Sequence, residues 1–433
     1  MNDFRIEFDN PNAVYFPGQA VTGRIVIQNR ESIKARFLKI CIHGGAHTHW
    51  QEHEHKHRTD SRGRSESYTE HVTYSAAVNY LTGESLAWSS NDSKSKLPAG
   101  ENIFPFAFSL PAQCPPSFEG FHGSIRYSVH VELDRPWKFN SKSKKCFSVI
   151  PAYDLNITPT AANPMVSTTS KNTGVLFKKG LVTMTVSLPK RGFVPGEILP
   201  ITINIDNASK KPVVTVRAKL CQFSHYAASR GHSSVMVHDT MATGYSHPHH
   251  HQKQDSKEVA ECRRNMDVCP GSKGQVVLSM KVPAIVPSFQ CPIITVDYCV
   301  TVKLDTSGML GNTLKCEFPL IIGTIPIRQV VPISGVGVLP TAPPAAMPTV
   351  PPSAPPYPYP VVAGSSANAS VYPSAPPALS GFGSAEPSAP PSYEESMLGS
   401  AAKDDAEPFA PRYPVYNNLP QTDAPPVLEK SGF

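Results

Sequence analysis

The feature that most constrains this chain is an alternation of apolar and polar residues, with a period of two, in short runs from residue 4 to residue 325. Clear runs are 125–133 (IRYSVHVEL) and 296–304 (VDYCVTVKL). Each run has one apolar and one polar face, which is typical of an antiparallel strand that covers a core on one side. No segment long enough for a stable helix has the periodicity of an amphipathic helix. The alternation therefore predicts an all-β body.

The alternating pattern also repeats as a larger unit. Segment 17–29 begins with Pro-Gly and ends with Asn, and segment 195–207 does the same with the same internal spacing. The tripeptide PSF precedes an alternating run at 116–118 and again at 287–289. Two landmarks in the same order in each half indicate two copies of one antiparallel β-sandwich.

Composition sets the domain boundaries. Prolines and a polar run mark 151–176 as a linker. Residues 328–433 lose the alternation and carry 23 of the 45 prolines, with too few large apolar residues to offset the entropy of ordering. We therefore expect an N-terminal sandwich at 1–150, the linker, a C-terminal sandwich at 177–327 and a disordered Pro-rich tail at 328–433.

Charge and cysteine content restrict the environment. The tail has a net charge of −4 and the remainder +10, which suits a protein near an anionic membrane or phosphorylated partners, or simply a solvated surface. Nine cysteines without a CxxC pair indicate a reducing compartment rather than a disulfide framework or a zinc site. No apolar run long enough to span a membrane, secretory signal or lipidation motif is present, so a cytoplasmic protein is expected.

Catalytic motifs are missing from the sequence. It contains no Gly-rich phosphate loop, no GxSxG and no HExxH, so we expect no enzyme, no catalytic residues and no cofactor. No nucleic-acid partner is expected either. Two histidine-rich tracts, at 47–57 and 247–251, lack a partnering Cys or Asp constellation. We interpret them as solvated polar loops and expect no metal site.

Several further segments, in a fixed order, carry a family resemblance. They are PGQAVTGRI at 17–25, LPAG at 97–100, FPF at 104–106, PSFEG at 116–120, LDRPW at 133–137 and PLIIGTIP at 319–326. On the basis of these segments, the chain resembles the α-arrestin (arrestin domain-containing) family. The resemblance extends over essentially the whole chain. The resemblance implies two tandem arrestin-like, immunoglobulin-like sandwiches in a trafficking adaptor. It also implies membrane receptor or transporter cargo and recruitment to the plasma membrane and endosomes.

The tail carries a PPxY motif formed by Pro390, Pro391, Ser392 and Tyr393. A WW domain binds such a motif because the prolines of a polyproline-II strand fit between aromatic side chains and the tyrosine fills a separate pocket. Preformed polyproline-II lowers the entropy cost of binding. With the α-arrestin resemblance, the expected partner is a WW-domain HECT-type ubiquitin ligase. A degenerate second site at 410–413 keeps Pro411 and Tyr413 but has Ala410 at the first proline position.

Four tetrapeptides in the tail resemble the late-domain motif that the UEV domain of the ESCRT machinery binds. They are Pro340-Thr341-Ala342-Pro343, Pro352-Ser353-Ala354-Pro355, Pro373-Ser374-Ala375-Pro376 and Pro387-Ser388-Ala389-Pro390. The alternative is duplication of a low-complexity unit. If one copy binds weakly, four copies add effective concentration.

Two further alternatives stay open at this point. The basic residues Arg135, Lys138, Lys142, Lys144 and Lys145 are candidates for contact with phosphoinositide headgroups or a phosphorylated cargo tail, or are a solvated hairpin. The whole chain is alternatively a non-catalytic signalling scaffold, with a tail that binds SH3 or other polyproline readers without a ubiquitin step. Dependence of WW binding on Tyr393 distinguishes the adaptor from the scaffold.

Overall fold

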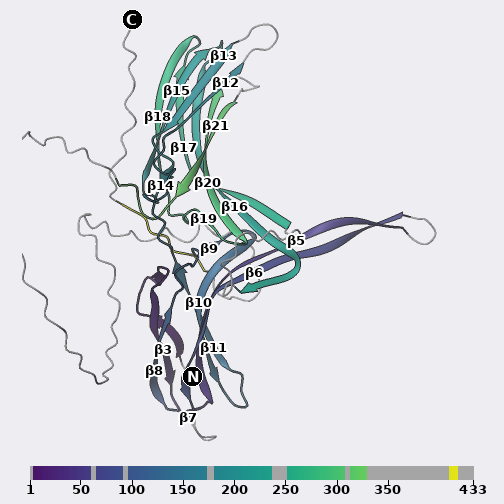
Figure 1. Ribbon diagram of the computed structural model, residues 1–433, viewed down its shortest axis with the longest axis vertical. Helices are drawn as coiled ribbons and strands as arrows, with labels where there is room; N and C mark the ends of the chain where they lie inside the picture. The colour runs from purple at the N-terminus through teal and green to yellow at the C-terminus, as the bar shows by residue number, and fades with distance from the viewer. Residues whose placement is uncertain are drawn as a thin grey trace, which may run out of the picture. The chain divides into compact units, whose positions relative to one another are not determined.

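The structure is a computed structural model that describes residues 3–59, 65–90, 96–172, 180–236, 251–307, 313–328 and 409–417. Within these ranges the regular secondary structure is all strand, which confirms the all-β prediction (Figure 1). None of the described residues form a helix long and apolar enough to cross a membrane.

The N-terminal half contains eleven described strands. They are β1 (Asp3–Phe8), β2 (Val14–Tyr15), β3 (Ala20–Asn29), β4 (Ile33–Lys34), β5 (Phe37–Thr59), β6 (Ser65–Ser89), β7 (Lys96–Leu97), β8 (Gly100–Ser109), β9 (Phe118–Glu119), β10 (Gly123–Asp134) and β11 (Ser141–Val149). Sheet β1-β3-β8 and the run β6-β5-β10-β11-β2 form the first sandwich. Alternate residues such as Ile25, Ile27 and Val129 are buried between these sheets, as the alternating pattern predicts.

The C-terminal half contains ten described strands. They are β12 (Met165–Asn172), β13 (Leu181–Leu188), β14 (Gly192–Phe193), β15 (Ile198–Ala208), β16 (Val213–Met236), β17 (His251–Val268), β18 (Ser272–Lys281), β19 (Phe289–Gln290), β20 (Ile294–Thr306) and β21 (Thr313–Ile322). Sheet β12-β13-β15-β18 and the run β17-β16-β20-β21-β14 form the second sandwich. Parallel pairing of β16 with β6, for example Ser229 with Ser75, joins the two larger sheets.

The repeat found in the sequence reappears as repeated hydrogen bonding. The Oγ of Ser117 accepts the N–H of Val149 at 2.9 Å, and the Oγ of Ser288 accepts the N–H of Ile322 at 3.0 Å. Both serines are buried and belong to the PSF landmarks. A buried hydroxyl is retained only where it is hydrogen-bonded, so this arrangement explains why both halves carry the same tripeptide.

Two stretches differ from the sequence interpretation. Residues 165–172, predicted as part of the linker, form edge strand β12, whose Thr168 hydroxyl bonds that of Thr185 at 3.0 Å. The histidine tract 47–57, predicted as a polar loop, lies within β5. None of the positions of β12, or of β5 beyond Trp50, is buried, so the alternation there lacks its usual apolar signal. His47 and His49 occupy the exposed positions on either side of the buried Thr48.

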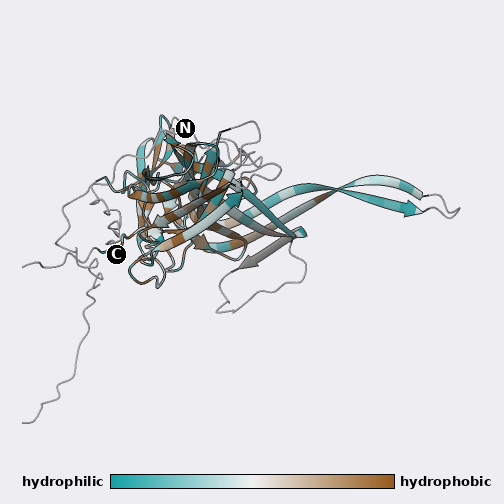
Figure 2. Cartoon of the chain, turned by 90° about the horizontal axis from the view of Figure 1, so that it is seen from above, coloured by the Kyte–Doolittle hydropathy of each residue, from teal (hydrophilic) through white to brown (hydrophobic). Residues whose placement is uncertain are grey.

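The outer part of the β5–β6 hairpin is mostly hydrophilic, whereas hydrophobic and hydrophilic residues are interspersed along the strands of the sandwiches (Figure 2). The rings of His53 and His71 pack edge to face across this hairpin with centroids 4.3 Å apart. In the part of the chain that the structure describes, no three His, Cys, Asp or Glu side chains are grouped as metal ligands. Residues 247–250 of the second histidine tract lie outside the described residues.

Candidate functional site

The two PSF landmarks meet where the sandwiches join. Phe118 of β9 and Phe289 of β19 pack edge to face with ring centroids 5.7 Å apart. Nearby, the Thr48 hydroxyl donates to the carbonyl of Ala227 at 2.8 Å, from one sandwich to the other. The junction therefore includes a contact between equivalent phenylalanines of the two repeats.

Residues 409–417 of the tail lie extended along this junction (yellow in Figure 1). The Arg412 N–H donates to Ser148 Oγ at 3.0 Å, and its Nη1 donates to the Asn12 carbonyl at 3.2 Å. The Tyr416 N–H donates to the Pro195 carbonyl at 3.0 Å. The segment thus contacts both sandwiches, and it departs from the prediction of a tail that is disordered throughout 328–433.

Tyr413 anchors the segment on the N-terminal side. Its ring packs against the main core, and its hydroxyl donates to the carbonyl of Ser117 at 2.9 Å. Burial, and secondarily the Glu119 carboxylate, raises the pKa of the Tyr413 hydroxyl well above its usual value. The site therefore holds Tyr413 as a neutral hydrogen-bond donor.

Tyr416 anchors the segment on the C-terminal side. Its ring packs against the small apolar cluster that includes Leu155 and Val194, and its hydroxyl donates to the Thr324 carbonyl at 2.6 Å. Burial raises the pKa of this tyrosine also. We call the surface that contacts residues 409–417 the docking groove; Tyr413 hydrogen-bonds to the N-terminal sandwich there, and Tyr416 hydrogen-bonds to the C-terminal half.

Gly196 allows the tail backbone to approach this closely. It has φ +92°, and a Cβ placed on it would clash with the carbonyl oxygen of Tyr416 and lie 2.7 Å from the Tyr416 nitrogen. The turn is held by the buried Glu197, whose carboxylate pairs with Lys190 and accepts the N–H of Val194 at 3.1 Å. The Pro-Gly landmark shared by the two repeats predicts a glycine at position 196. It does not predict that this glycine contacts the tail.

The predicted recognition residues separate into two groups. Pro411 and Tyr413 lie in the docked segment. The PPxY motif of Pro390, Pro391 and Tyr393, and all four tetrapeptides between Pro340 and Pro390, lie outside the described residues.

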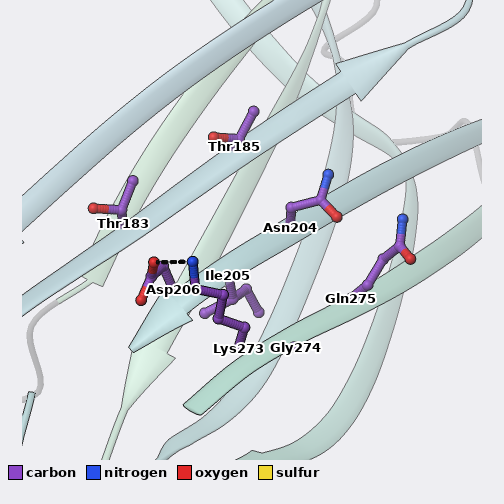
Figure 3. A pocket seen from close by; sticks show the side chains of 8 residues that line it. All are labelled: Thr183, Thr185, Asn204, Ile205, Asp206, Lys273, Gly274 and Gln275. Carbon is purple, nitrogen blue, oxygen red and sulfur yellow. Dashed lines mark ion pairs between the residues drawn. The ribbon is translucent and has the colours of Figure 1, made fainter. Parts of the chain in front are cut away.

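A second candidate is a depression of about 390 Å³ on the exposed face of the sheet β12-β13-β15-β18 (Figure 3). Its lining residues are Thr183, Thr185, Asn204, Ile205, Asp206, Lys273, Gly274 and Gln275. Lys273 and Asp206 pair with each other at 3.0 Å, so the two charges compensate. The hydroxyls of Thr183 and Thr185 are hydrogen-bonded to those of Ser170 at 2.8 Å and Thr168 at 3.0 Å.

Comparison with known proteins identifies the fold family. The model described as Arrestin (or S-antigen), N-terminal domain, matches residues 4–156, and Arrestin (or S-antigen), C-terminal domain, matches residues 178–327. The chain is 30% identical over 321 residues to Arrestin domain-containing protein 4 of Mus musculus, covering 73% of this chain and 70% of that protein. The chain belongs to the α-arrestin family.

Two further arrestin domain-containing proteins are similar to the chain over most of its length. Arrestin domain-containing protein 17 of Caenorhabditis elegans is 28% identical over 353 residues, 78% of this chain and 76% of that protein. Arrestin domain-containing protein 1 of Homo sapiens is 29% identical over 349 residues, 79% of this chain and 69% of that protein. Membership confirms the resemblance found in the sequence. It supports a trafficking and adaptor role in general, and it is consistent with a non-catalytic protein.

Proposed function

We propose that this α-arrestin links membrane receptor or transporter cargo to WW-domain HECT-type ubiquitin ligases. Ubiquitination of the cargo then promotes its endocytosis and endosomal sorting. The proposal is carried by the PPxY motif ending at Tyr393 in a chain whose body is two arrestin sandwiches. The body binds cargo, and the tail recruits the ligase. Such a protein acts in the cytoplasm and is recruited to the plasma membrane and endosomes.

The docking groove makes the two tail motifs unequal. A WW domain needs the tyrosine ring of its motif in its own pocket. The Tyr413 ring already packs against the core, and its hydroxyl is bonded to Ser117. Ligase recruitment in the docked state therefore depends on Tyr393, and the second site becomes accessible only when residues 409–417 leave the groove.

Calorimetric titration of the full chain with an isolated WW domain tests this assignment. Tyr393→Ala is expected to weaken binding by about 30-fold, because a hot-spot side chain is worth ~2 kcal/mol. Tyr413→Ala is expected to change the affinity little, since this ring is not available to the WW domain. Equal losses in both variants would show that the groove does not protect the second motif. Binding independent of Tyr393 would favour the SH3-type scaffold.

We propose that the tetrapeptides bind an ESCRT UEV domain. Pro390 closes the last tetrapeptide and opens the PPxY motif, so the two motifs together run only from Pro387 to Tyr393. In polyproline-II this span is about 20 Å long, which is too short for two folded domains.

A UEV domain should therefore compete with a WW domain for a peptide covering 384–398. The full tail should bind both together through the upstream copies. A ternary complex on the short peptide, seen by analytical ultracentrifugation, would contradict this exclusion. Failure of the UEV domain to bind the tail would show that the tetrapeptides are low-complexity repeats and not binding motifs.

A further inference from the structure

The turn between β10 and β11 displays two aromatic side chains to solvent. Trp137 is 102% exposed and Phe139 is 98% exposed, the highest values among the exposed large hydrophobic residues of the described chain. Large aromatic side chains normally bury most of their surface. Two of them fully exposed in one turn indicate a surface that meets an apolar partner.

The turn is built to hold these rings away from the sandwich. At its base, Asn140 Oδ1 accepts the N–H of Arg135 at 3.2 Å, and Asn140 Nδ2 donates to Glu132 Oε1 at 2.8 Å. Trp137 itself has φ +63°, a conformation that bulky residues rarely adopt. A strained residue that persists at an exposed tip points to a role at that tip.

Basic residues are neighbours of the two aromatic residues in the sequence. Lys138 lies between them in the sequence, and the Lys142 side chain is 71% exposed. Of the neighbouring carboxylates, Glu132 pairs with Lys142 at 3.4 Å and Asp134 pairs with Arg36 at 2.7 Å, so the net positive charge of the turn is that of Arg135 and Lys138. We call Arg135, Trp137, Lys138, Phe139 and Lys142 the aromatic–basic tip.

The structure reduces the number of residues in the predicted basic run that are available to a partner. Lys145 donates to the carbonyl of Ile6 at 3.0 Å, and its ammonium lies 5.4 Å from the centroid of the Phe8 ring. Lys145 therefore interacts with the N-terminal sandwich. The basic residues considered below are those of the aromatic–basic tip.

We propose that the aromatic–basic tip docks on an anionic lipid bilayer, with Trp137 and Phe139 inserted at the level of the headgroups. Tryptophan favours the membrane interface because its ring is apolar and its indole N–H is polar. Lysine side chains place their aliphatic stems along the interface and their charges among the headgroups. A phosphorylated peptide would satisfy the charges but leave both rings exposed, so the bilayer accounts for more of the tip.

Vesicle co-sedimentation of the full chain tests the proposal. The vesicles are phosphatidylcholine alone, or phosphatidylcholine with phosphatidylserine. We expect binding to the second kind, with the Trp137→Ser/Phe139→Ser variant weakened at least about tenfold, because burial of each ring is lost. In the Lys138→Gln/Lys142→Gln variant, the affinity for these vesicles should fall about fivefold per lysine, and by less at high salt. Ile157→Ser, at an 80% exposed apolar residue outside the tip, should bind normally.

Tryptophan fluorescence distinguishes insertion from charge attraction alone. The chain has three tryptophans; Trp50 is buried and Trp88 is half-buried, so a blue shift on phosphatidylserine vesicles should come from Trp137 and disappear in Trp137→Phe. Full vesicle binding by the serine variant, or no blue shift, would overturn the proposal. So would Lys138- and Lys142-dependent binding of a soluble phosphopeptide or inositol phosphate without any vesicle binding.

Discussion

The Gly196→Ala variant is expected to release residues 409–417 from the docking groove. The added Cβ would lie closer to the carbonyl oxygen of Tyr416 than two non-bonded atoms can approach. Displacement of Tyr416 breaks its two hydrogen bonds, to Pro195 and Thr324. Hydrogen exchange of the full chain should then show the Arg412 and Tyr416 amides losing protection.

The repeat provides a matched control for this variant. Gly18 occupies the equivalent position, with φ +83° against +92° at Gly196, and a Cβ on it would have nothing within 4 Å. Alanine in this conformation costs about 1–2 kcal/mol at either position. Gly18→Ala should therefore destabilise its turn similarly but leave the tail protected. Equal exchange of residues 409–417 in both variants would mean that the clash does not control docking.

The Phe118→Ala variant is expected to lower the free energy of unfolding by about 3–5 kcal/mol, the usual cost of removing a fully buried phenylalanine. Phe118 is 1% exposed and contacts Phe289 across the junction. The cavity cannot collapse easily, because neither sandwich moves without disturbing the other.

Phe289→Ala is the paired comparison. Phe289 is only half-buried, so its removal leaves a smaller cavity and should cost less. Chemical denaturation followed by circular dichroism measures both values. A larger loss from Phe289→Ala would show that the second sandwich, rather than the first, supplies the packing at the junction.

Much of the fold could be predicted from the sequence, because buried antiparallel strands show their alternation directly. The landmarks around Ser117 and Ser288 are recognisable because equivalent buried hydrogen bonds require the same residues in both repeats. The exposed strands give no such signal. In β12 and the outer part of β5 the alternating side chains are Ser, Thr and His, which also occur in loops.

The docking groove was not predicted because it depends on tertiary contacts between distant segments. The composition of 328–433 indicates disorder, and the Pro411–Tyr413 motif by itself predicts only a WW ligand. A local signal is nevertheless present: Phe409, Tyr413 and Tyr416 place three aromatic rings close together in a tail rich in small residues. Aromatic anchors of this density provide the apolar area that the rest of the tail lacks.

The most direct test of the adaptor proposal is affinity purification of the full chain from detergent-solubilised membranes, in parallel with Tyr393→Ala. We expect the full chain to retain both an integral membrane protein and a HECT-type ubiquitin ligase. Tyr393→Ala should retain the membrane protein and lose the ligase, because the proposal assigns cargo binding to the body and ligase binding to the tail. Retention of the ligase by Tyr393→Ala, or recovery of SH3-domain proteins with no ligase in either sample, would contradict the account.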